Sequence, residues 1–262
     1  VFIVTQVKPT ATPGIVRVKT EGGLHARMEK AILRPMVRGE DIDEWTFKVR
    51  SRIIWAYDDR TCKPLEKLPS EAERYFASEE VVKVTGRKPP WKHLGASLEK
   101  LKSKVAWPDL TTKMEAVFMP DHYYDPILGR VKLIPIKTVY FIPIDEEDLG
   151  YALTAVLNST LIRCFIMSFT ERARGGYFRH FSWVVGMVPM PKLIYSMTRL
   201  QTKSSKKERA IFNDLVKLSR EIHEEAKRGE INSERLEELD RLVAKAYGLT
   251  EGELETVKEY FN

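Results

Sequence analysis

One segment of the sequence combines basic, aromatic and glycine residues in a way that suits contact with nucleic acid. Residues Arg172 to His180 read Arg-Ala-Arg-Gly-Gly-Tyr-Phe-Arg-His. Arginine pairs with phosphates or binds guanine through two hydrogen bonds, glycine lets a backbone approach closely, and aromatic rings stack or wedge. The alternative is an exposed loop with Phe178 tucked into the core. We favour nucleic-acid contact because the charge of the chain points the same way.

The positive charge is concentrated in one part of the chain. The sequence has 43 Lys and Arg residues against 37 Asp and Glu residues, which gives a net charge of +6. From Arg199 to the end the net charge is −1, so the part before Arg199 carries +7. We therefore expect a polyanionic partner to contact the part before Arg199. On charge alone, lysines that are simply solvated would explain the net charge equally well, without a polyanionic partner.

Motifs that would make the chain an enzyme are missing from the sequence. It has no Gly-x-Gly-x-x-Gly and no Walker loop, and its five histidines lack the spacing of metal ligands. Lys88-Pro89-Pro90-Trp91 resembles the Pro-Pro-aromatic core of an amino-methyltransferase motif. That motif begins with an amide or acid that accepts a hydrogen bond from the flipped base, and lysine has only donors. We interpret the segment as a turn and predict no catalytic residue and no metal site in this chain.

A self-contained Mg²⁺-dependent nuclease stays open as an alternative. Pro108-Asp109 and Pro120-Asp121 each begin like a nuclease metal site. Neither is followed by an acidic-x-Lys element at a suitable spacing, and Mg²⁺ needs converging carboxylates. Weaker basic or aromatic clusters lie at Arg34 to Asp41 and at Asp121 to Asp125.

Several features predict a cytoplasmic protein without a membrane partner. The longest apolar run, Leu161 to Phe169, is shorter than the roughly 18 residues that cross a bilayer. Val1 to Thr5 is too short for a signal peptide, and we interpret Val1 as the cut edge of a longer protein. Cys62 and Cys164 stand far apart, which supports neither a zinc site nor a disulfide framework. The Lys/Glu-rich, glutamine-poor composition hints at a thermophilic source.

The element pattern predicts an α+β fold with a mixed sheet. Up to about Tyr195, runs that alternate or are rich in β-branched residues indicate strands. These runs are Ile15 to Lys19, Thr46 to Arg50, Arg52 to Tyr57, and Val131 to Ile144. In the last run, Pro135 and Pro143 should mark edges or ends of strands. Helical patterns lie at Ser70 to Phe76, with a Ser70–Glu73 capping box, at about Leu94 to Val105, and at Asp148 to Phe169.

A change of pattern near residue 199 predicts two domains. We expect an α+β domain over residues 1–198 and a small helical bundle over 199–262. Its helices are expected at about Ser205 to Lys227, Ser233 to Tyr247 and Glu251 to Phe261. Gly229 and Gly248 stand at the breaks, Ser233 is expected to cap the second helix, and Thr250 with Glu253 forms a capping box for the third.

Ordered motifs along the chain resemble the TaqI-like C-terminal specificity domain of adenine-N6 DNA methyltransferases and fused restriction-modification enzymes. In chain order they are Leu33 to Ile42 with Trp45, Arg87 with Trp91 and Leu94, Trp107, Leu153 to Ile166 with Leu157-Asn158-Ser159 at its centre, Gly175-Gly176-Tyr177, Val188 to Pro191, Leu239 to Val243, and Ala246 to Thr250 with Glu253. Each motif alone is loose, but their order is fairly specific. Residues before Arg27 and from Lys113 to Ile144 match least.

The resemblance implies a division of labour within a longer enzyme. A preceding Rossmann-like domain would bind S-adenosylmethionine and methylate a flipped adenine, while this chain grips double-stranded DNA and reads base edges. The resemblance implies DNA contacts at Arg174, Tyr177, Arg179 and His180, and more weakly at Arg38, Lys113 and His122. Arg38-Gly39 also suits a purely structural turn. A third alternative is a protein-interaction scaffold that uses the helices after Ser204.

Overall fold

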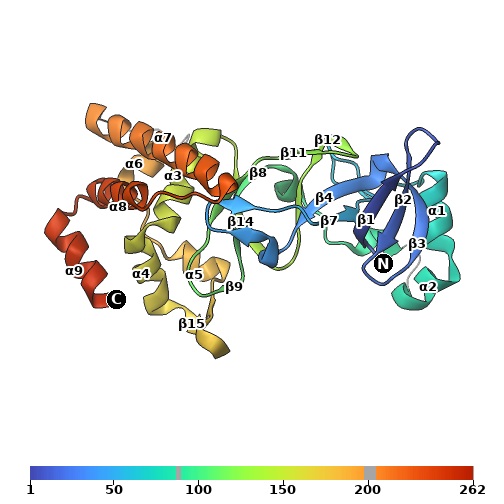
Figure 1. The fold of residues 1–262 in the computed structure, drawn as a ribbon, viewed down its shortest axis with the longest axis horizontal. Helices are drawn as coiled ribbons and strands as arrows, with labels where there is room; N and C mark the ends of the chain where they lie inside the picture. The colour runs from blue at the N-terminus through green and yellow to red at the C-terminus, as the bar shows by residue number, and fades with distance from the viewer. Residues whose placement is uncertain (87–89, 198–204, 262) are drawn as a thin grey trace. The chain divides into compact units, whose positions relative to one another are not determined.

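The computed structural model describes residues 1–86, 90–197 and 205–261, and it confirms an α+β fold (Figure 1). The chain divides into two compact units, each drawn from separate stretches of sequence. The first comprises Val1–Val37, Lys48–Lys102 and Pro120–Ile136, and the second Arg38–Phe47, Ser103–Met119 and Lys137–Asn262. The structure thus differs from the predicted division after residue 198. The difference arises because the C-terminal helices share a core with the elements before them.

The first unit is built on a mixed sheet. The strand order is β13-β4-β7-β1-β2-β3, in which β13 pairs with β4 in parallel and the other neighbours are antiparallel. The strands are β1 Ile3–Pro9, β2 Ile15–Thr20, β3 His25–Glu29, β4 Leu33–Val37, β7 Ser51–Ile54 and β13 Ile134–Pro135. The other elements of this unit are the hairpin β11 His122–Asp125 with β12 Gly129–Lys132, helices α1 Ser70–Ala77 and α2 Glu79–Thr85, and 3-10 turns η1 Lys30–Ile32, η3 Pro90–His93 and η4 Leu98–Leu101.

Both faces of this sheet are covered, because side chains alternate between faces along a strand. Ile54 joins the cluster that packs under α1 and α2, where it shares a core with Tyr75 and Phe76. Its neighbour Ile53 lies in a separate cluster with Trp55 and Tyr57. The dense run of β-formers in this strand therefore reflects burial on both sides.

The second unit combines small antiparallel sheets with a group of helices. Its strands are β8 Ser103–Pro108, β10 Val117–Met119 and β14 Val139–Ile144 in the order β10-β8-β14, a hairpin of β5 Ile42–Asp43 and β6 Thr46–Phe47, and a small sheet of β9 Leu110–Thr111, β15 Glu171–Arg172 and β16 Phe178–Arg179. Its helices are α3 Glu147–Asn158, α4 Thr160–Phe169, α5 Ser182–Gly186, α6 Lys192–Met197, α7 Lys206–Arg228, α8 Ser233–Tyr247 and α9 Glu251–Phe261, with 3-10 turns η2 Gly39–Asp41 and η5 Arg174–Gly176.

Helix α3 is the centre of this unit. It contacts β8 and β10 of the small sheet and also helix α7. Its contact with β10 is close at Gly150, where an added Cβ would stand 2.4 Å from the ring of Phe118. A glycine is needed in this helix because no side chain fits between α3 and that ring.

The predicted single helix over Asp148 to Phe169 is wrong. The structure has two helices, α3 and α4, which meet at Ser159 at an angle of 65°. The Ser159 hydroxyl accepts a hydrogen bond from the Ile162 N–H at 3.4 Å, and the carboxylate of Asp240 accepts one from the Thr160 N–H at 2.8 Å. A side-chain cap and a distant aspartate together start the second helix, and the apolar spacing alone could not reveal the break.

Other local predictions are confirmed in part. The helix at Leu94 to Val105 is wrong, since η4 is followed directly by β8. Of Thr46 to Arg50 only Thr46–Phe47 is a strand. The prediction for the two prolines is confirmed, because Pro135 ends β13 and Pro143 lies near the end of β14, an edge strand. The Lys88-Pro89 part of the predicted turn, and Arg87, lie outside the described residues.

Two of the five predicted helix caps differ from prediction. Helix α1 exists, but the carboxylate of Glu29 accepts hydrogen bonds from the N–H groups of Glu71 and Ala72 at 2.7 and 3.0 Å, in place of the expected box. Helix α8 is capped by Asn232 instead of Ser233. The Thr250–Glu253 box and the left-handed Gly229 and Gly248 caps are confirmed.

No single helix in the described ranges is long and apolar enough to cross a membrane. Helices α3 and α4 pass the test of length and composition only together, as a bent pair. Both contribute to the buried core of the second unit.

Candidate nucleic-acid interface

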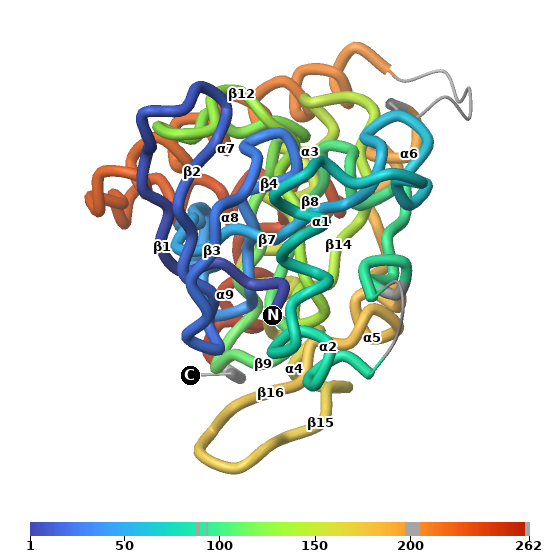
Figure 2. Tube along the Cα trace, turned by 90° about the vertical axis from the view of Figure 1, so that its right-hand side faces the viewer, coloured from blue at the N-terminus to red at the C-terminus, as the bar shows by residue number. Residues whose placement is uncertain are grey.

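A short hairpin of the second unit carries the predicted basic and aromatic cluster. Strands β15 and β16 pair through Arg172 and Phe178, and β16 pairs with β9. Gly175 and Gly176 form the turn with φ of 77° and 78°, a left-handed conformation that glycine adopts without steric cost. The loop that joins the strands extends beyond the neighbouring elements of this unit (Figure 2). The sequence therefore builds a projecting loop with its polar groups at the tip.

The tip presents one arginine and one tyrosine to solvent. Arg174 is exposed, and Tyr177 is 43% exposed. Within the part of the chain that the structure describes, Arg174 has no ion-pair partner. At the base, the guanidinium of Arg172 lies 5.8 Å from the centre of the Phe178 ring. Phe178 itself is buried and anchors the hairpin, as the alternative interpretation expected for this residue alone.

Arg179 is held from two sides at the base of the hairpin. Its guanidinium lies 3.2 Å from the carboxylate of Asp109 and 5.7 Å from the centre of the Phe181 ring. The side chain remains 40% exposed. The ion pair neutralises part of its charge, so Arg179 is positioned to contact a polyanion but is less available than Arg174.

His180 cannot reach a ligand directly because its side chain is fully buried. Its backbone is fixed by two hydrogen bonds of 2.8 Å, one donated to the carbonyl of Asp109 and one accepted from the indole of Trp107. Burial lowers the pKa of the His180 imidazole to about 4, even with Asp109 nearby, so the ring is neutral at pH 7. We therefore leave His180 out of the direct contacts and assign it to support of the hairpin.

Lys113 and Arg38 belong to the same unit but already have partners. Lys113 pairs with the carboxylate of Glu44, which also pairs with Arg163 at 2.7 Å. Burial raises the pKa of Glu44, but the two cations outweigh that effect and hold the pKa below its ordinary value. Arg38 contacts Glu40 at 3.3 Å. Contact of both cations with DNA stays a prediction. Each also has a structural role, and the sequence did not indicate the role of Lys113.

His122 lies in the first unit, on the hairpin of β11 and β12. Its ring Nδ1 lies 2.9 Å from the carboxylate of Asp121, which Lys132 also contacts at 2.7 Å. The neighbouring Tyr124 is 75% exposed. The His122 contact with DNA stays a prediction.

The motif residues behind the family resemblance have structural roles in the second unit. The Asp41 carboxylate accepts a hydrogen bond from the Arg38 N–H at 3.0 Å and closes η2. The Asn158 side chain exchanges two hydrogen bonds of 2.8 Å with the backbone of Ala116. These residues fix the framework that carries the hairpin.

Gly39 of the same turn is required by close packing, which gives a first prediction. An added Cβ would stand 2.8 Å from the backbone carbonyl oxygen of Thr138, which cannot move like a side-chain end. We expect Gly39→Ala to lower the free energy of unfolding by about 1–3 kcal/mol, the range for overpacked sites. Urea unfolding measures it against Gly252→Ala, where nothing lies within 4 Å. Equal stability of the two variants would contradict the packing argument.

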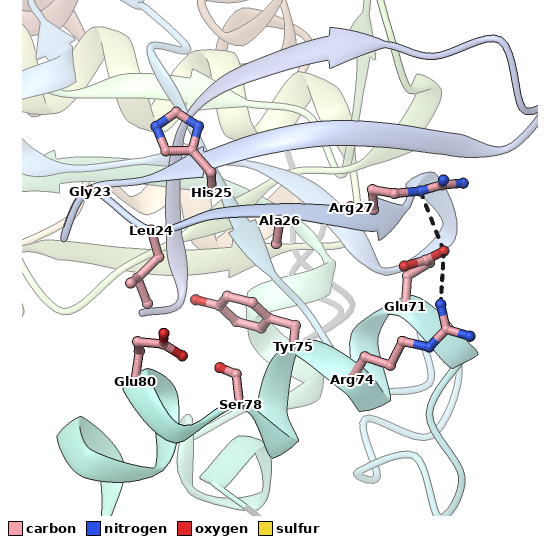
Figure 3. Close-up of a pocket in the computed structure, with 10 residues that line it drawn as sticks. All are labelled: Gly23, Leu24, His25, Ala26, Arg27, Glu71, Arg74, Tyr75, Ser78 and Glu80. Carbon is pink, nitrogen blue, oxygen red and sulfur yellow. Dashed lines mark ion pairs between the residues drawn. The ribbon is translucent and has the colours of Figure 1, made fainter.

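The first unit contains a surface cavity of about 400 Å³ between β3 and α1 (Figure 3). Glu71 lies between its two arginines, 3.4 Å from Arg27 and 3.6 Å from Arg74. The hydroxyl of Tyr75 donates to the carbonyl of Val1 at 2.5 Å, and burial raises its pKa to about 12. Arg27, Glu71 and Arg74 are thus tied to one another, and no hydrogen bond in the described part of the cavity joins a nucleophile to a base.

The aspartates considered for a nuclease site are each paired with a cation. Asp109 contacts Arg179, and Asp121 contacts Lys132. Among the described residues no three His, Cys, Asp or Glu side chains gather in a way that could hold a metal ion. No observation in the structure favours the nuclease alternative over nucleic-acid binding.

No protein-family model matches the chain, and no curated protein matches it.

Proposed function

We propose that this chain is a DNA target-recognition module that serves an adenine-N6 DNA methyltransferase or a restriction-modification enzyme. The observation that carries the proposal is the projecting hairpin with Arg174 and Tyr177 at its tip and Arg172 and Arg179 at its base. A two-stranded ribbon fits the major groove of B-form DNA, where base edges present a distinct pattern for each pair. The motif resemblance supports this choice of enzyme class.

The arrangement suggests separate tasks for the hairpin cations. Arg174 has a planar guanidinium without an ion pair in the described chain and is suited to two hydrogen bonds with a guanine edge. Arg172 and Arg179 lie beside aromatic rings that fix their orientation, which suits contacts with phosphates. Methyl transfer itself is assigned to a separate catalytic domain that would supply S-adenosylmethionine, and no chemical step is assigned to this chain.

Duplex binding that depends on salt is the test of the proposed function. The purified chain is titrated into a fluorescein-labelled duplex pool of random sequence at rising NaCl concentrations, with anisotropy as the readout. We expect the affinity to fall steeply with salt, because each phosphate contact releases a counterion. If the chain does not bind duplex at low salt, the proposal fails.

Arg174→Ala gives the residue-level prediction. Loss of a bidentate guanine contact costs roughly 1–3 kcal/mol, so we expect duplex affinity to fall about tenfold with unchanged stability. Arg241→Ala removes the same charge from α8, where Arg241 is 52% exposed, and serves as the matched control. Equal weakening by the two variants would show that only overall charge matters, and would contradict a role for the hairpin.

A further inference from the structure

An exposed tryptophan beside the hairpin continues a stack of side chains that begins at Arg179. The Arg179 guanidinium lies 5.7 Å from the centre of the Phe181 ring. The Phe181 ring stacks in turn on Trp183, with centroids 6.4 Å apart and planes 20° apart. Trp183 is 59% exposed, so the outer end of the stack is open to solvent. The three residues form a ladder of flat groups, called here the Arg179–Trp183 ladder.

The ladder is held firmly by the core of the second unit. Val184 and Val185, which follow Trp183 in α5, are buried. Tyr140 meets the Phe181 ring edge to face, with centroids 6.3 Å apart and planes 79° apart. The fold itself does not use the exposed surface of Trp183, since its neighbours in α5 supply the packing. An oriented aromatic plane is thus presented outward without a partner in the described chain.

We propose that Trp183 is a stacking platform for an unpaired nucleobase, an inference that rests on the proposed function. A base is the occupant that the ladder fits, because its flat π surface can stack on the exposed Trp183 ring, which lies nearly parallel to the Phe181 ring. The charge next to the platform agrees, since Arg172, Arg174 and Arg179 lie in the adjoining hairpin and suit the phosphates on either side of such a base. A purely apolar partner would not use these three arginines.

The platform should distinguish unpaired from paired bases. In an intact duplex both faces of each internal base are stacked, whereas a bulged or flipped-out base offers a free face. Stacking of one base on an aromatic side chain changes affinity roughly tenfold in proteins that bind single strands. The ladder therefore adds recognition of a disturbed base to the reading of the duplex by the hairpin.

Three labelled probes of equal length test this inference with the whole chain. They are an intact duplex, the same duplex with one bulged adenine, and the single strand. We expect the chain to prefer the bulged duplex to the intact one. Trp183→Ala should lower affinity for the bulged duplex about tenfold and leave the intact duplex within about twofold, whereas Trp183→Phe should keep most of the preference.

Two controls separate stacking from general effects. Tyr195→Ala removes another aromatic side chain of the same unit, 51% exposed, and should leave all three affinities unchanged. Quenching of tryptophan fluorescence by the bulged duplex should disappear in Trp183→Phe, since Trp45, Trp55 and Trp107 are buried and the half-buried Trp91 packs against the core of the first unit. Urea unfolding of each variant checks that the chain still folds.

The outcomes distinguish this inference from the proposed function. If the wild-type chain binds no duplex at low salt, the proposed function fails and the inference fails with it. Suppose instead that the chain binds duplex but Trp183→Ala lowers the affinity for the intact and the bulged probe equally, or lowers neither affinity. Then only the inference is overturned. It is also overturned if Trp183→Ala converts a dimer into a monomer without changing DNA affinity, because the surface would then join two copies of the chain.

Discussion

Acid is expected to destabilise the chain between pH 6.5 and 4, because two buried histidines are neutral in the folded state. Burial lowers the pKa of His223 and of His180 to about 4. An unfolded histidine takes up its proton near pH 6.5. Their contribution to stability is therefore complete above pH 6.5 and is lost as pH falls towards 4, by about 3 kcal/mol for each fully buried ring.

The surroundings of His223 explain why the neutral ring is favoured. Its Nδ1 lies 2.7 Å from the carbonyl oxygen of Ser219 and donates to it, while its Nε2 accepts a hydrogen bond from the Phe118 N–H at 3.2 Å. Trp45 and Tyr151 meet the ring edge-on, with centroids 5.4 and 5.0 Å away. A second proton on Nε2 would oppose the Phe118 N–H, and these neighbours offer it no carboxylate.

Urea unfolding at pH 7, 6, 5 and 4 checks this expectation. His223→Gln keeps a donor and an acceptor but cannot titrate, so its stability should fall less between pH 6.5 and 4 than that of the wild type. Carboxylates also titrate near pH 4, but they do so in both proteins. Subtracting the unfolding free energy of one protein from that of the other at each pH therefore removes the contribution of the carboxylates. His25→Gln, at an exposed residue of β3, is the control. Parallel pH curves for wild type and His223→Gln would rule out this role.

Replacing Glu44 with alanine is expected to lower the free energy of unfolding by about 3 kcal/mol, the cost of leaving partly buried cations unpaired. The Glu44 carboxylate pairs with Arg163 at 2.7 Å and with Lys113, and it accepts a hydrogen bond from the Trp45 indole at 2.8 Å. Its side chain is only 13% exposed. The indole bond matters further because Trp45 is buried with φ of 66°, a conformation that tryptophan rarely adopts.

Two further variants divide this effect into its parts. Glu44→Gln keeps an acceptor for Trp45 but removes the charge, so it should lose less stability than Glu44→Ala and reveal the ionic share. Glu40→Gln changes a carboxylate that is 66% exposed and pairs with Arg38, and it should cost below about 0.5 kcal/mol. Chemical unfolding of the four proteins gives the comparison. A loss for Glu44→Ala no larger than that for Glu40→Gln would contradict the central role of Glu44.

The α+β class and most of the C-terminal helices were predictable because their signals are local. Glycines at helix ends, capping boxes and apolar spacing placed α7, α8 and α9 within one or two residues. The break at Ser159 was not predictable, because Asp240 supplies part of the cap from a distant helix. The interleaving of the two units likewise depends on contacts between residues far apart in sequence.

The hairpin was the part of the candidate site that the sequence located best. The sequence predicted a basic and aromatic loop over Arg172 to His180, and the structure places Arg174 and Tyr177 at the exposed tip of a hairpin there. Burial of His180 was not visible in the local sequence, because it depends on strand β9 and Trp107. Trp183 was missed because a tryptophan beside Val184 and Val185 resembles an ordinary core residue.

The pairing of β13 with β4 has a consequence for synthesis on the ribosome. Ile134 of β13 lies opposite Met36 of β4, so the edge of the first sheet is completed only after the chain has been made as far as β13. Closing so long a loop is slow compared with forming local hairpins such as β1–β2. The nascent chain will therefore expose the edge of β4 during elongation, and a stop or cleavage before Ile134 will leave a product that cannot finish this sheet.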